Sequence, residues 1–282
     1  MPALDGMRVL DMTQYEAGTA CTQALAWLGA DVVKIERPGT GDPGRGLLVG
    51  GDHSAYFLSW NANKRSVAVA LEKPEGRELL LHMHPRYDVF VENFGPGVLE
   101  KLGLEYEAMR AVHPAISHAR IKGFGGGGPY ASYKCFDMVA QAASGAFSVT
   151  GEPDGPPMCP GPTLADSGTG VQAALAITAA YVQRLRTGEG QQIEIAMQEA
   201  MTFYMRTRIA NGSEWGTRTV PRTGNGEGPM LNLYPCKPGG PNDYVYLVVA
   251  TPRMWDQLCA ALGRPDLASD PRFKGWLLRH EN

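Results

Sequence analysis

Met7-Arg-Val-Leu-Asp-Met12 and Asp31-Val-Val-Lys-Ile-Glu36 are two short apolar runs, and the segment between them, Ala20–Leu28, is helix-like and ends at Gly29. This order predicts two parallel strands joined by a helix in a right-handed crossover. Pro38-Gly39 ends the second strand. Because the first turn lacks a G-x-G-x-x-G pattern, the unit does not favour a nicotinamide or flavin site.

Alternating strand and helix patterns continue after this unit. Strands are predicted at 65–71, 87–92 and 115–122, and helices at 74–84 and 98–102. Strands that alternate with helices are typical of a parallel sheet covered by helices. The sequence therefore predicts an α/β fold.

The next part of the chain contains the best-formed helical pattern. Val171, Leu175, Val182 and Leu185 recur near helical spacing, which predicts a helix from about Ser167 to Arg186. A strand at 192–197 and a helix at 199–209 are predicted to follow.

A change in composition near Asn211, toward Gly, Thr, Arg and Pro, indicates a second region. A strand at 244–250 and a helix at 253–262 are predicted within it. We therefore expect a large domain over residues 1–210, and a linker with a small domain over residues 211–282.

Composition argues against several classes of protein. The 26 Lys and Arg nearly balance 29 Asp and Glu, giving a net charge of −3, so no strong field attracts nucleic acid or a membrane surface. The cysteines and histidines show no metal-binding spacing and no C-x-x-C pair, which favours reduced thiols and no metal site. The N-terminus lacks a secretory signal pattern, and the apolar stretch Val171–Val182 is too short to span a bilayer. We expect a cytoplasmic protein.

The glycine run Gly123-Phe-Gly-Gly-Gly-Gly128 formally satisfies G-x-G-x-x-G after a predicted strand. That motif binds a dinucleotide when a helix begins at its third glycine, but here Pro129-Tyr130 follows the run. Two other interpretations are a flexible loop that lets the backbone approach a substrate and a plain turn.

Asp166 lies immediately before the predicted long helix. Its simplest interpretation is an N-cap, a position that Asp favours. The same position suits a nucleophile, because amide donors and the positive end of the helix dipole would keep its carboxylate ionised. Gly168 and Gly170 would leave room for a substrate, so attack on an activated acyl group is the functional alternative.

Several basic residues at loops or element ends are candidates for anion binding. They are Arg37, Lys64, Arg65, Lys101 and Lys134. Each by itself is most simply a solvated surface cation. Gathered around one crevice, they would suit phosphate groups, and the sequence leaves both interpretations open.

A series of motifs occurs in order along the chain. It comprises Asp11-Met-Thr-Gln-Tyr-Glu-Ala-Gly18, Gly29-Ala-Asp-Val-Val-Lys-Ile-Glu-Arg-Pro-Gly39, Asn63-Lys-Arg-Ser66, Val91-Glu-Asn-Phe-Gly-Pro-Gly97, Lys122-Gly-Phe-Gly125, Tyr133-Lys134, Val139-Ala-Gln141, Leu164-Ala-Asp-Ser-Gly168 and Thr187-Gly-Glu-Gly-Gln191. Together these motifs resemble the family III CoA-transferases over about residues 4 to 275. That group includes formyl-CoA:oxalate and carnitine CoA-transferases and α-methylacyl-CoA racemase.

The resemblance implies a Rossmann-like large domain, a smaller α/β domain and a homodimer whose chains interlock like links. It implies coenzyme A and acyl-CoA as substrates, with a small carboxylic acid as the other substrate and no permanently bound cofactor. Because family members run beyond position 282, it also implies a C-terminally truncated chain with an incomplete small domain.

The resemblance also implies roles for individual residues. Asp166 matches the catalytic aspartate, which forms a mixed anhydride with the acyl group and then a thioester with CoA. The residues implied to hold CoA are Tyr15, Arg37, Lys64, Asn93, Phe94, Lys101, Lys134 and Met197. Those implied to contact the acyl group are Glu16, Gly125, Gly126 and Gly127.

Three positions depart from the family's patterns. Glu16 stands where the formyl-CoA transferases carry glutamine, which changes the electrostatics beside the acyl group. Gly224-Asn-Gly-Glu-Gly228 is less glycine-rich than the corresponding loop of the oxalate enzymes. The racemases place a histidine directly before an aspartate, whereas here Phe136 precedes Asp137, and a phenylalanine transfers no proton.

Transfer of CoA between carboxylic acids is therefore the leading hypothesis. The alternatives are racemisation or epimerisation of an acyl-CoA, and a non-catalytic fragment that binds CoA esters.

Overall fold

The computed structural model describes residues 1–48, 54–214 and 216–282, which fall into two compact units. The first unit takes residues 1–146 and 159–215, and the second takes 147–158 and 216–282. The division between them therefore lies beyond position 210, and a short segment near the middle of the chain, residues 147–158, also belongs to the second unit.

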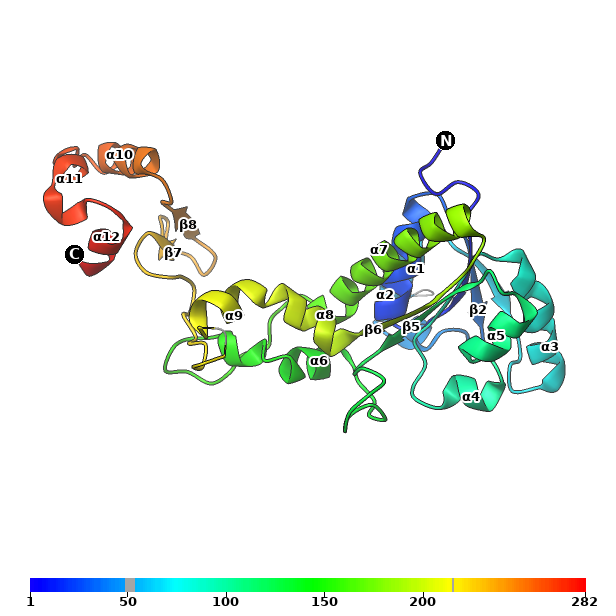
Figure 1. Cartoon of the computed structure of the whole chain (residues 1–282). Helices are drawn as coiled ribbons and strands as arrows, with labels where there is room; N and C mark the ends of the chain where they lie inside the picture. The colour runs from blue at the N-terminus through cyan, green and yellow to red at the C-terminus, as the bar shows by residue number, and fades with distance from the viewer. Residues whose placement is uncertain (49–53, 215) are drawn as a thin grey trace. The chain divides into compact units, whose positions relative to one another are not determined.

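A parallel sheet forms the centre of the first unit, and six strands of the described residues build it (Figure 1). Their order is β3-β2-β1-β4-β5-β6, and they span Arg8–Met12 (β1), Asp31–Glu36 (β2), Arg65–Ala68 (β3), Val89–Glu92 (β4), Ser117–Lys122 (β5) and Gln192–Ala196 (β6). All neighbours pair in parallel. This is the strand order of the Rossmann fold, so the predicted α/β class is confirmed.

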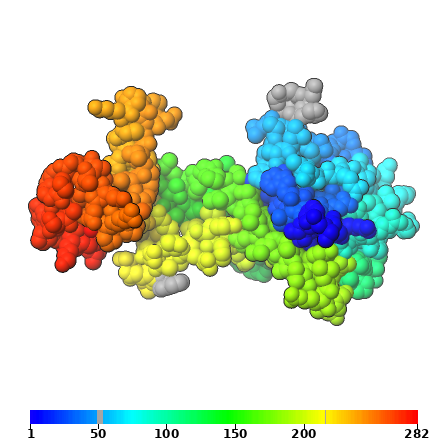
Figure 2. All heavy atoms as spheres, turned by 90° about the horizontal axis from the view of Figure 1, so that it is seen from above, coloured from blue at the N-terminus to red at the C-terminus, as the bar shows by residue number. Residues whose placement is uncertain are grey.

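Helices cover both faces of this sheet (Figure 1). One face carries α1 (Ala17–Trp27) and α7 (Leu164–Thr187), and the other carries α3 (Pro74–Met83), α4 (Val98–Leu102) and α5 (Tyr106–Val112). Leu10 and Met12 of β1 pack with Leu80 and Leu99 in a core cluster under α3 and α4. Side chains alternate along a strand, so Asp11 is directed to the opposite face, beneath α1. Figure 2 shows these layers in contact, with blue, cyan and yellow-green atoms packed together.

Glycines allow α1 and α7 to approach closely. A Cβ at Gly170 would lie 2.7 Å from the carbonyl oxygen of Ala17 and 2.8 Å from the Cβ of Ala20. The buried face of α7 is accordingly made of small residues such as Ala173 and Ala174, with Ile177. The larger apolar side chains that predicted the helix, Leu175 among them, lie on its exposed face.

The structure corrects several predicted boundaries. Helix α7 begins at Leu164 with Thr163 as its N-cap, so Asp166 is the third helical residue and the N-cap prediction was wrong. The helix predicted at 199–209 is two helices, α8 (Met197–Tyr204) and α9 (Arg206–Gly212). Helices α2 (Ala55–Asn61) and α6 (Asp137–Ala143) were not predicted. Short 3-10 turns span Pro43–Gly46 (η1) and His84–Arg86 (η2).

The second unit has its own small core of Val249, Trp255 and Cys259. Its described elements are η3 (Phe147–Val149), β7 (Leu231–Pro235), β8 (Tyr244–Val248), α10 (Pro252–Ala261), α11 (Asp266–Ser269), η4 (Pro271–Phe273) and α12 (Trp276–Glu281). Strands β7 and β8 pair antiparallel. The Arg222 guanidinium donates hydrogen bonds to the carbonyls of Glu152 and Gly155, which ties segment 147–158 to this unit.

Candidate active site

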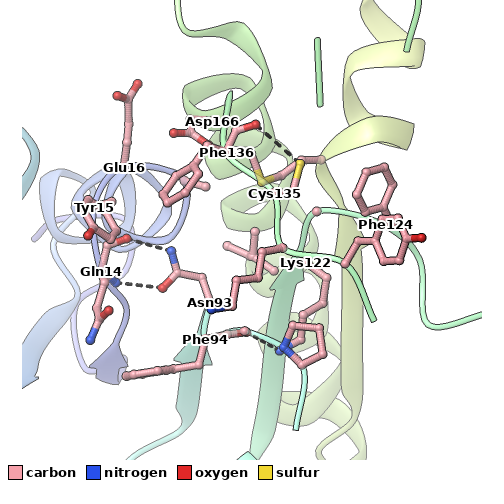
Figure 3. Close-up of a pocket in the computed structure, with 18 of the residues that line it drawn as sticks. Gln14, Tyr15, Glu16, Asn93, Phe94, Lys122, Phe124, Cys135, Phe136 and Asp166 are labelled. Carbon is pink, nitrogen blue, oxygen red and sulfur yellow. Dashed lines mark hydrogen bonds between the residues drawn. The ribbon is translucent and has the colours of Figure 1, made fainter. Parts of the chain in front are cut away.

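A cleft of about 910 Å³ opens in the first unit at the carboxyl ends of β1 and β4 (Figure 3). The strand order reverses between these two strands, and open α/β sheets bind ligands at such a point. Its lining residues come from the loops after β1, β4 and β5 and from α7 and α8. They are Gln14, Tyr15, Glu16, Ala17, Asn93, Phe94, Gly95, Pro96, Ile121, Lys122, Gly123, Phe124, Ala131, Tyr133, Lys134, Cys135, Phe136, Asp166 and Met197.

The loop after β1 is fixed by the loop after β4. The Asn93 amide oxygen accepts from the Gln14 backbone N–H at 2.8 Å, and the Asn93 amide nitrogen donates to the Gln14 carbonyl at 2.7 Å (Figure 3). The Tyr15 backbone N–H donates to Asp42 at 3.2 Å, and Tyr15 adopts a left-handed conformation with φ of 58°. A non-glycine residue in this conformation is strained unless its surroundings hold it, so these contacts preorganise the start of α1.

Two buried ion pairs support the same loop from below. Lys34 Nζ lies 2.8 Å from Asp42 Oδ2 and donates to the Thr13 carbonyl at 2.7 Å. Lys64 Nζ lies 3.1 Å from Asp11 Oδ2, with both side chains almost fully buried. Burial opposes ionisation of Asp11, but the ammonium groups of Lys64 and Lys34 outweigh it and lower its pKa. Lys64 therefore acts inside the protein, and it is not placed to meet a phosphate in the cleft.

Asp166 lies in the first turn of α7 and reaches the cleft wall (Figure 3). Its backbone N–H donates to Asp137 Oδ1 at 3.0 Å. The other carboxylate oxygen of Asp137 accepts from the Gln141 side-chain amide at 2.5 Å, and this amide also donates to the Pro162 carbonyl. Asp137 thus caps α7 from the start of α6, because its carboxylate accepts one of the free N–H groups in the first turn of α7.

The carboxyl of Asp166 is not held ionised as the sequence predicted. Burial, together with the negative charges of Glu16 and Asp137, raises its pKa to about 7. No ion pair to Asp166, Glu16 or Asp137 is found among the described residues. The helix dipole is outweighed here because desolvation and two like charges act at close range. Near neutral pH Asp166 therefore divides between its acid and its carboxylate forms.

Glu16 precedes α1 and is 4% exposed. Its Oε1 accepts a hydrogen bond from the Thr163 hydroxyl, and Tyr56 is its other hydrogen-bonding neighbour. Burial raises the pKa of Glu16, and the charge of Asp137 adds to the effect, against the hydrogen bond from Thr163. Glu16 thus joins the start of α1 to the start of α7 beside the nucleophile candidate.

Aromatic rings and a thiol complete this end of the cleft. The rings of Tyr15 and Phe136 meet edge to face with centroids 5.8 Å apart, and Phe136 is 60% exposed. Burial and the charges of Asp166 and Asp137 raise the pKa of Cys135 to about 11. The thiol is therefore neutral near pH 7, so Cys135 does not compete with Asp166 as a nucleophile.

The structure brings some of the residues implied to hold CoA together, and not others. Those that line the cleft are Tyr15, Asn93, Phe94, Lys134 and Met197. Lys134 is exposed and has no ion pair in the described part of the chain, whereas the Lys122 ammonium is taken by Glu92 and by the Phe94 carbonyl. Lys101 is exposed on α4 and does not line the cleft.

Arg37 lies at a second hollow of about 880 Å³, which adjoins the first. Gln14 and Phe94 line both hollows. An elongated ligand could therefore extend from Asp166 past Phe94 to Arg37 without leaving the carboxyl edge of the sheet.

Gly125, Gly126 and Gly127 of the run after β5 lie outside the cleft lining, whereas Gly123 is part of it. The Gly126 backbone N–H donates to Glu194 at 2.7 Å, and a Cβ at Gly127 would meet nothing within 4 Å. No helix begins in this run, so the structure excludes the dinucleotide interpretation and gives a loop. Gly125 lies near Glu199 rather than Asp166.

Sequence reasoning missed three residues of the site. The sequence analysis named Asp137 only because Phe136 precedes it where the racemases have a histidine. An aspartate at the start of a helix is, however, a known N-terminal signal. Gln14 and Lys122 line the cleft and were named only inside motifs. Gln14 and Lys122 are far apart in the sequence, so their spacing does not predict that both line one cleft.

Residues 4–282 match the sequence pattern of the family described as CoA-transferase family III. The chain belongs to this family. It is a CoA-transferase.

Two curated relatives share more than two fifths of the sequence of this CoA-transferase. It is 45% identical to the formyl-CoA:oxalate CoA-transferase of Streptomyces avermitilis over 96% of this chain and 69% of the relative. It is 44% identical to the enzyme of the same name from Streptomyces coelicolor, with the same coverage.

Solved structures show the same architecture. A CaiB/BaiF family protein from Brucella suis is 34% identical, with a TM-score of 0.86 over 100% of this chain and 75% of that protein. A hypothetical protein from Mycobacterium tuberculosis is 32% identical, also with a TM-score of 0.86, over 100% and 74%.

The described residues form neither a membrane-spanning helix nor a cluster of metal ligands. No helix among them is both long and apolar enough to cross a membrane. No three of their His, Cys, Asp and Glu side chains gather as metal ligands would.

Proposed function

We propose that this CoA-transferase moves CoA from an acyl-CoA to a carboxylic acid through covalent intermediates on Asp166. The observation that carries the proposal is that Asp166 reaches the wall of a cleft at the switch point of the sheet. Cys135 beside it is held as a neutral thiol, so the Asp166 carboxylate is the better nucleophile at this point.

The reaction divides into paired steps. The Asp166 carboxylate attacks the thioester carbonyl, forming a C–O bond and breaking the C–S bond, which gives a mixed anhydride and CoA thiolate. The thiolate attacks the aspartyl carbonyl and releases the donor acid, leaving an aspartyl-CoA thioester. The acceptor carboxylate then attacks this thioester, and the released thiolate attacks the acceptor's acyl carbon, freeing Asp166. No net proton is consumed, and the acyl activation passes from one acid to the other.

The surrounding residues suit the parts of an acyl-CoA. Phe94 and Met197 offer apolar contact to the pantetheine arm, and Lys134 offers a cation to the phosphates. Arg37 at the adjoining hollow suits the distal phosphate end, since Phe94 lines both hollows. Tyr15 and Asn93 hold the loop that carries Glu16, so their contribution is positioning as well as contact.

Trapping the intermediates tests this proposal. The protein is incubated with a panel of short acyl-CoA thioesters, formyl-CoA among them, and quenched with hydroxylamine. Peptide mass spectrometry should find a hydroxamate at Asp166, and Asp166→Ala should abolish exchange of label between acids. Turnover without modification of Asp166 would contradict the mechanism. Solvent deuterium at the α-carbon without exchange between acids would indicate a racemase instead.

A second copy of the chain is proposed to cover the outer face of α7. Val171, Leu175 and Leu185 are each at least 60% exposed and lie on one side of this helix. An apolar stripe of this kind is typical of an interface between subunits. A homodimer is the occupant that the family resemblance implies.

A further inference from the structure

The end of the cleft that contains Asp166, here called the acyl end, carries negative charges without a paired cation. Asp166, Glu16 and Asp137 act on one another electrostatically, and none of them has an ion pair in the parts of the chain that the structure describes. The hydrogen-bonding neighbours of Glu16 are the neutral hydroxyls of Thr163 and Tyr56. An incoming substrate therefore meets negative potential around the nucleophile with no cation to offset it.

The lysines in and beneath the cleft do not offset the negative charge at the acyl end. Lys122 is paired with Glu92 and hydrogen-bonded to the Phe94 carbonyl, toward the opposite end of the cleft (Figure 3). Lys64 and Lys34 are committed to Asp11 and Asp42 beneath the loop. Lys134 is exposed, and the proposed function assigns it to the phosphates of CoA.

The remaining walls at the acyl end are aromatic. Phe136 and Tyr15 stand edge to face beside Asp166, and most of the Phe136 side chain is open to a ligand (Figure 3). Aromatic rings favour apolar or uncharged groups, and they do not compensate a buried anion.

We propose that Glu16 is a specificity-determining residue that excludes a second carboxylate from the acyl position, so that the substrate acids are monocarboxylates. This inference rests on the proposed function, because it concerns the acid that exchanges CoA at Asp166. The acid's reacting carboxylate must lie against Asp166. Glu16 lines the same cleft as Asp166, so the second carboxylate of a short dicarboxylic acid would lie close to its charge. Like charges at such range in a partly desolvated site repel strongly.

Matched acids that differ by one charge test the inference. Each dicarboxylate, oxalate or malonate, is compared with its monoamide, oxamate or malonamate, which has nearly the same shape. With the donor thioester that the panel shows to be best, kcat/KM for the monoamide should exceed that for the dicarboxylate by at least about tenfold. In Glu16→Gln the ratio should fall toward one, chiefly through a lower KM for the dicarboxylate. In Glu16→Asp, which keeps the charge, it should stay high.

A ratio measured within one variant does not depend on how much of that variant is folded. A wild-type protein that uses the dicarboxylate as well as its monoamide would overturn the inference and leave the proposed function intact. An unchanged ratio in Glu16→Gln would also overturn it. Absence of exchange with every acid would contradict the proposed function, and the inference with it.

Discussion

The backbone N–H of Asp166 donates a 3.0 Å hydrogen bond to Oδ1 of Asp137, so one carboxylate caps the helix that carries the other. The contact joins α6 to α7 and fixes the turn from which Asp166 reaches the cleft. It also brings a negative charge beside Asp166, which contributes to the raised pKa of that group. Position and protonation of the nucleophile candidate are thus coupled through Asp137.

Substitutions of Asp137 should separate these two effects. Asp137→Asn keeps an oxygen acceptor for the Asp166 N–H and removes the charge, so the pKa of Asp166 should fall and exchange at pH 6 should rise relative to pH 8. Asp137→Ala also loses the cap, which costs about 1 kcal/mol of unfolding free energy. Thermal melts and exchange rates at both pH values measure the difference. Equal behaviour of the two variants would contradict the capping role.

The exchange reaction should depend on pH through Asp166. Only its carboxylate attacks a thioester, and its pKa is about 7, so kcat/KM should rise with pH and level off above that value. Glu16→Gln removes one of the repelling charges and should move the midpoint to lower pH. Glu75→Gln, an exposed glutamate on α3, is the matched control and should leave the midpoint unchanged. A flat wild-type profile between pH 5 and 9, a range of about two units on each side, would argue against Asp166.

Asp166 should lower the stability of the folded protein at alkaline pH. Its folded pKa of about 7 lies above the ordinary aspartate value of about 3.9, so the folded state binds the proton more tightly. This stabilisation is present at low pH and is lost progressively as pH rises through about 7. Asp166→Asn removes the penalty and should stabilise the protein by on the order of 1 to 3 kcal/mol at pH 8, and by little at pH 4. Melts of both proteins at the two pH values check this. A variant less stable than wild type at pH 8 would contradict it.

Gly170 should be required for the packing of α1 on α7. Gly170→Ala places a Cβ 2.7 Å from the Ala17 carbonyl and should cost about 1 to 3 kcal/mol. Because α1 begins beside Glu16, exchange should fall as well. Gly161→Ala is the control, since a Cβ there would meet nothing within 4 Å. Chemical denaturation of the two variants measures the difference, and equal stability would show that the helices can separate without cost.

The exposed stripe of α7 should mediate self-association. Leu175 is 72% exposed, and Leu175→Glu should weaken a homodimer by at least about tenfold, because it buries a charge in an apolar contact. Val112→Glu, on α5 at the opposite face of the sheet, should not. Sedimentation equilibrium measures the association constants. A monomeric wild type, or a variant that dimerises equally well, would show that this face is not the interface.

The sequence predicted the architecture because its signal is local. The apolar runs at 7–12 and 31–36, on either side of one helix, predict a β-α-β unit. The structure contains both strands, and their bounds differ from the prediction by at most one residue. The pattern of α7 predicted a helix correctly, yet its large apolar side chains proved to be the exposed ones. Periodicity shows that a helix has an apolar side, but a neighbour that packs through glycines and alanines can take the other side.

Only part of the candidate site could be predicted from the sequence. The motifs resemble a known family closely enough to single out Asp166, Asn93 and Phe94, and all three line the cleft. The buried pairing of Lys64 with Asp11 could not be seen, since a lysine in a polar motif is most often at the surface.

By itself, then, the sequence predicted the alternation of strands and helices and the family, and it singled out the residue that we propose as nucleophile. Only the tertiary structure decided how that residue is charged. Asp166, Asp137 and Glu16 come from the starts of three different helices. The pKa values of Asp166 and Glu16 depend on burial and on charges from segments far apart in the chain. Desolvation and Coulomb repulsion act through space, so no local pattern of residues could reveal them.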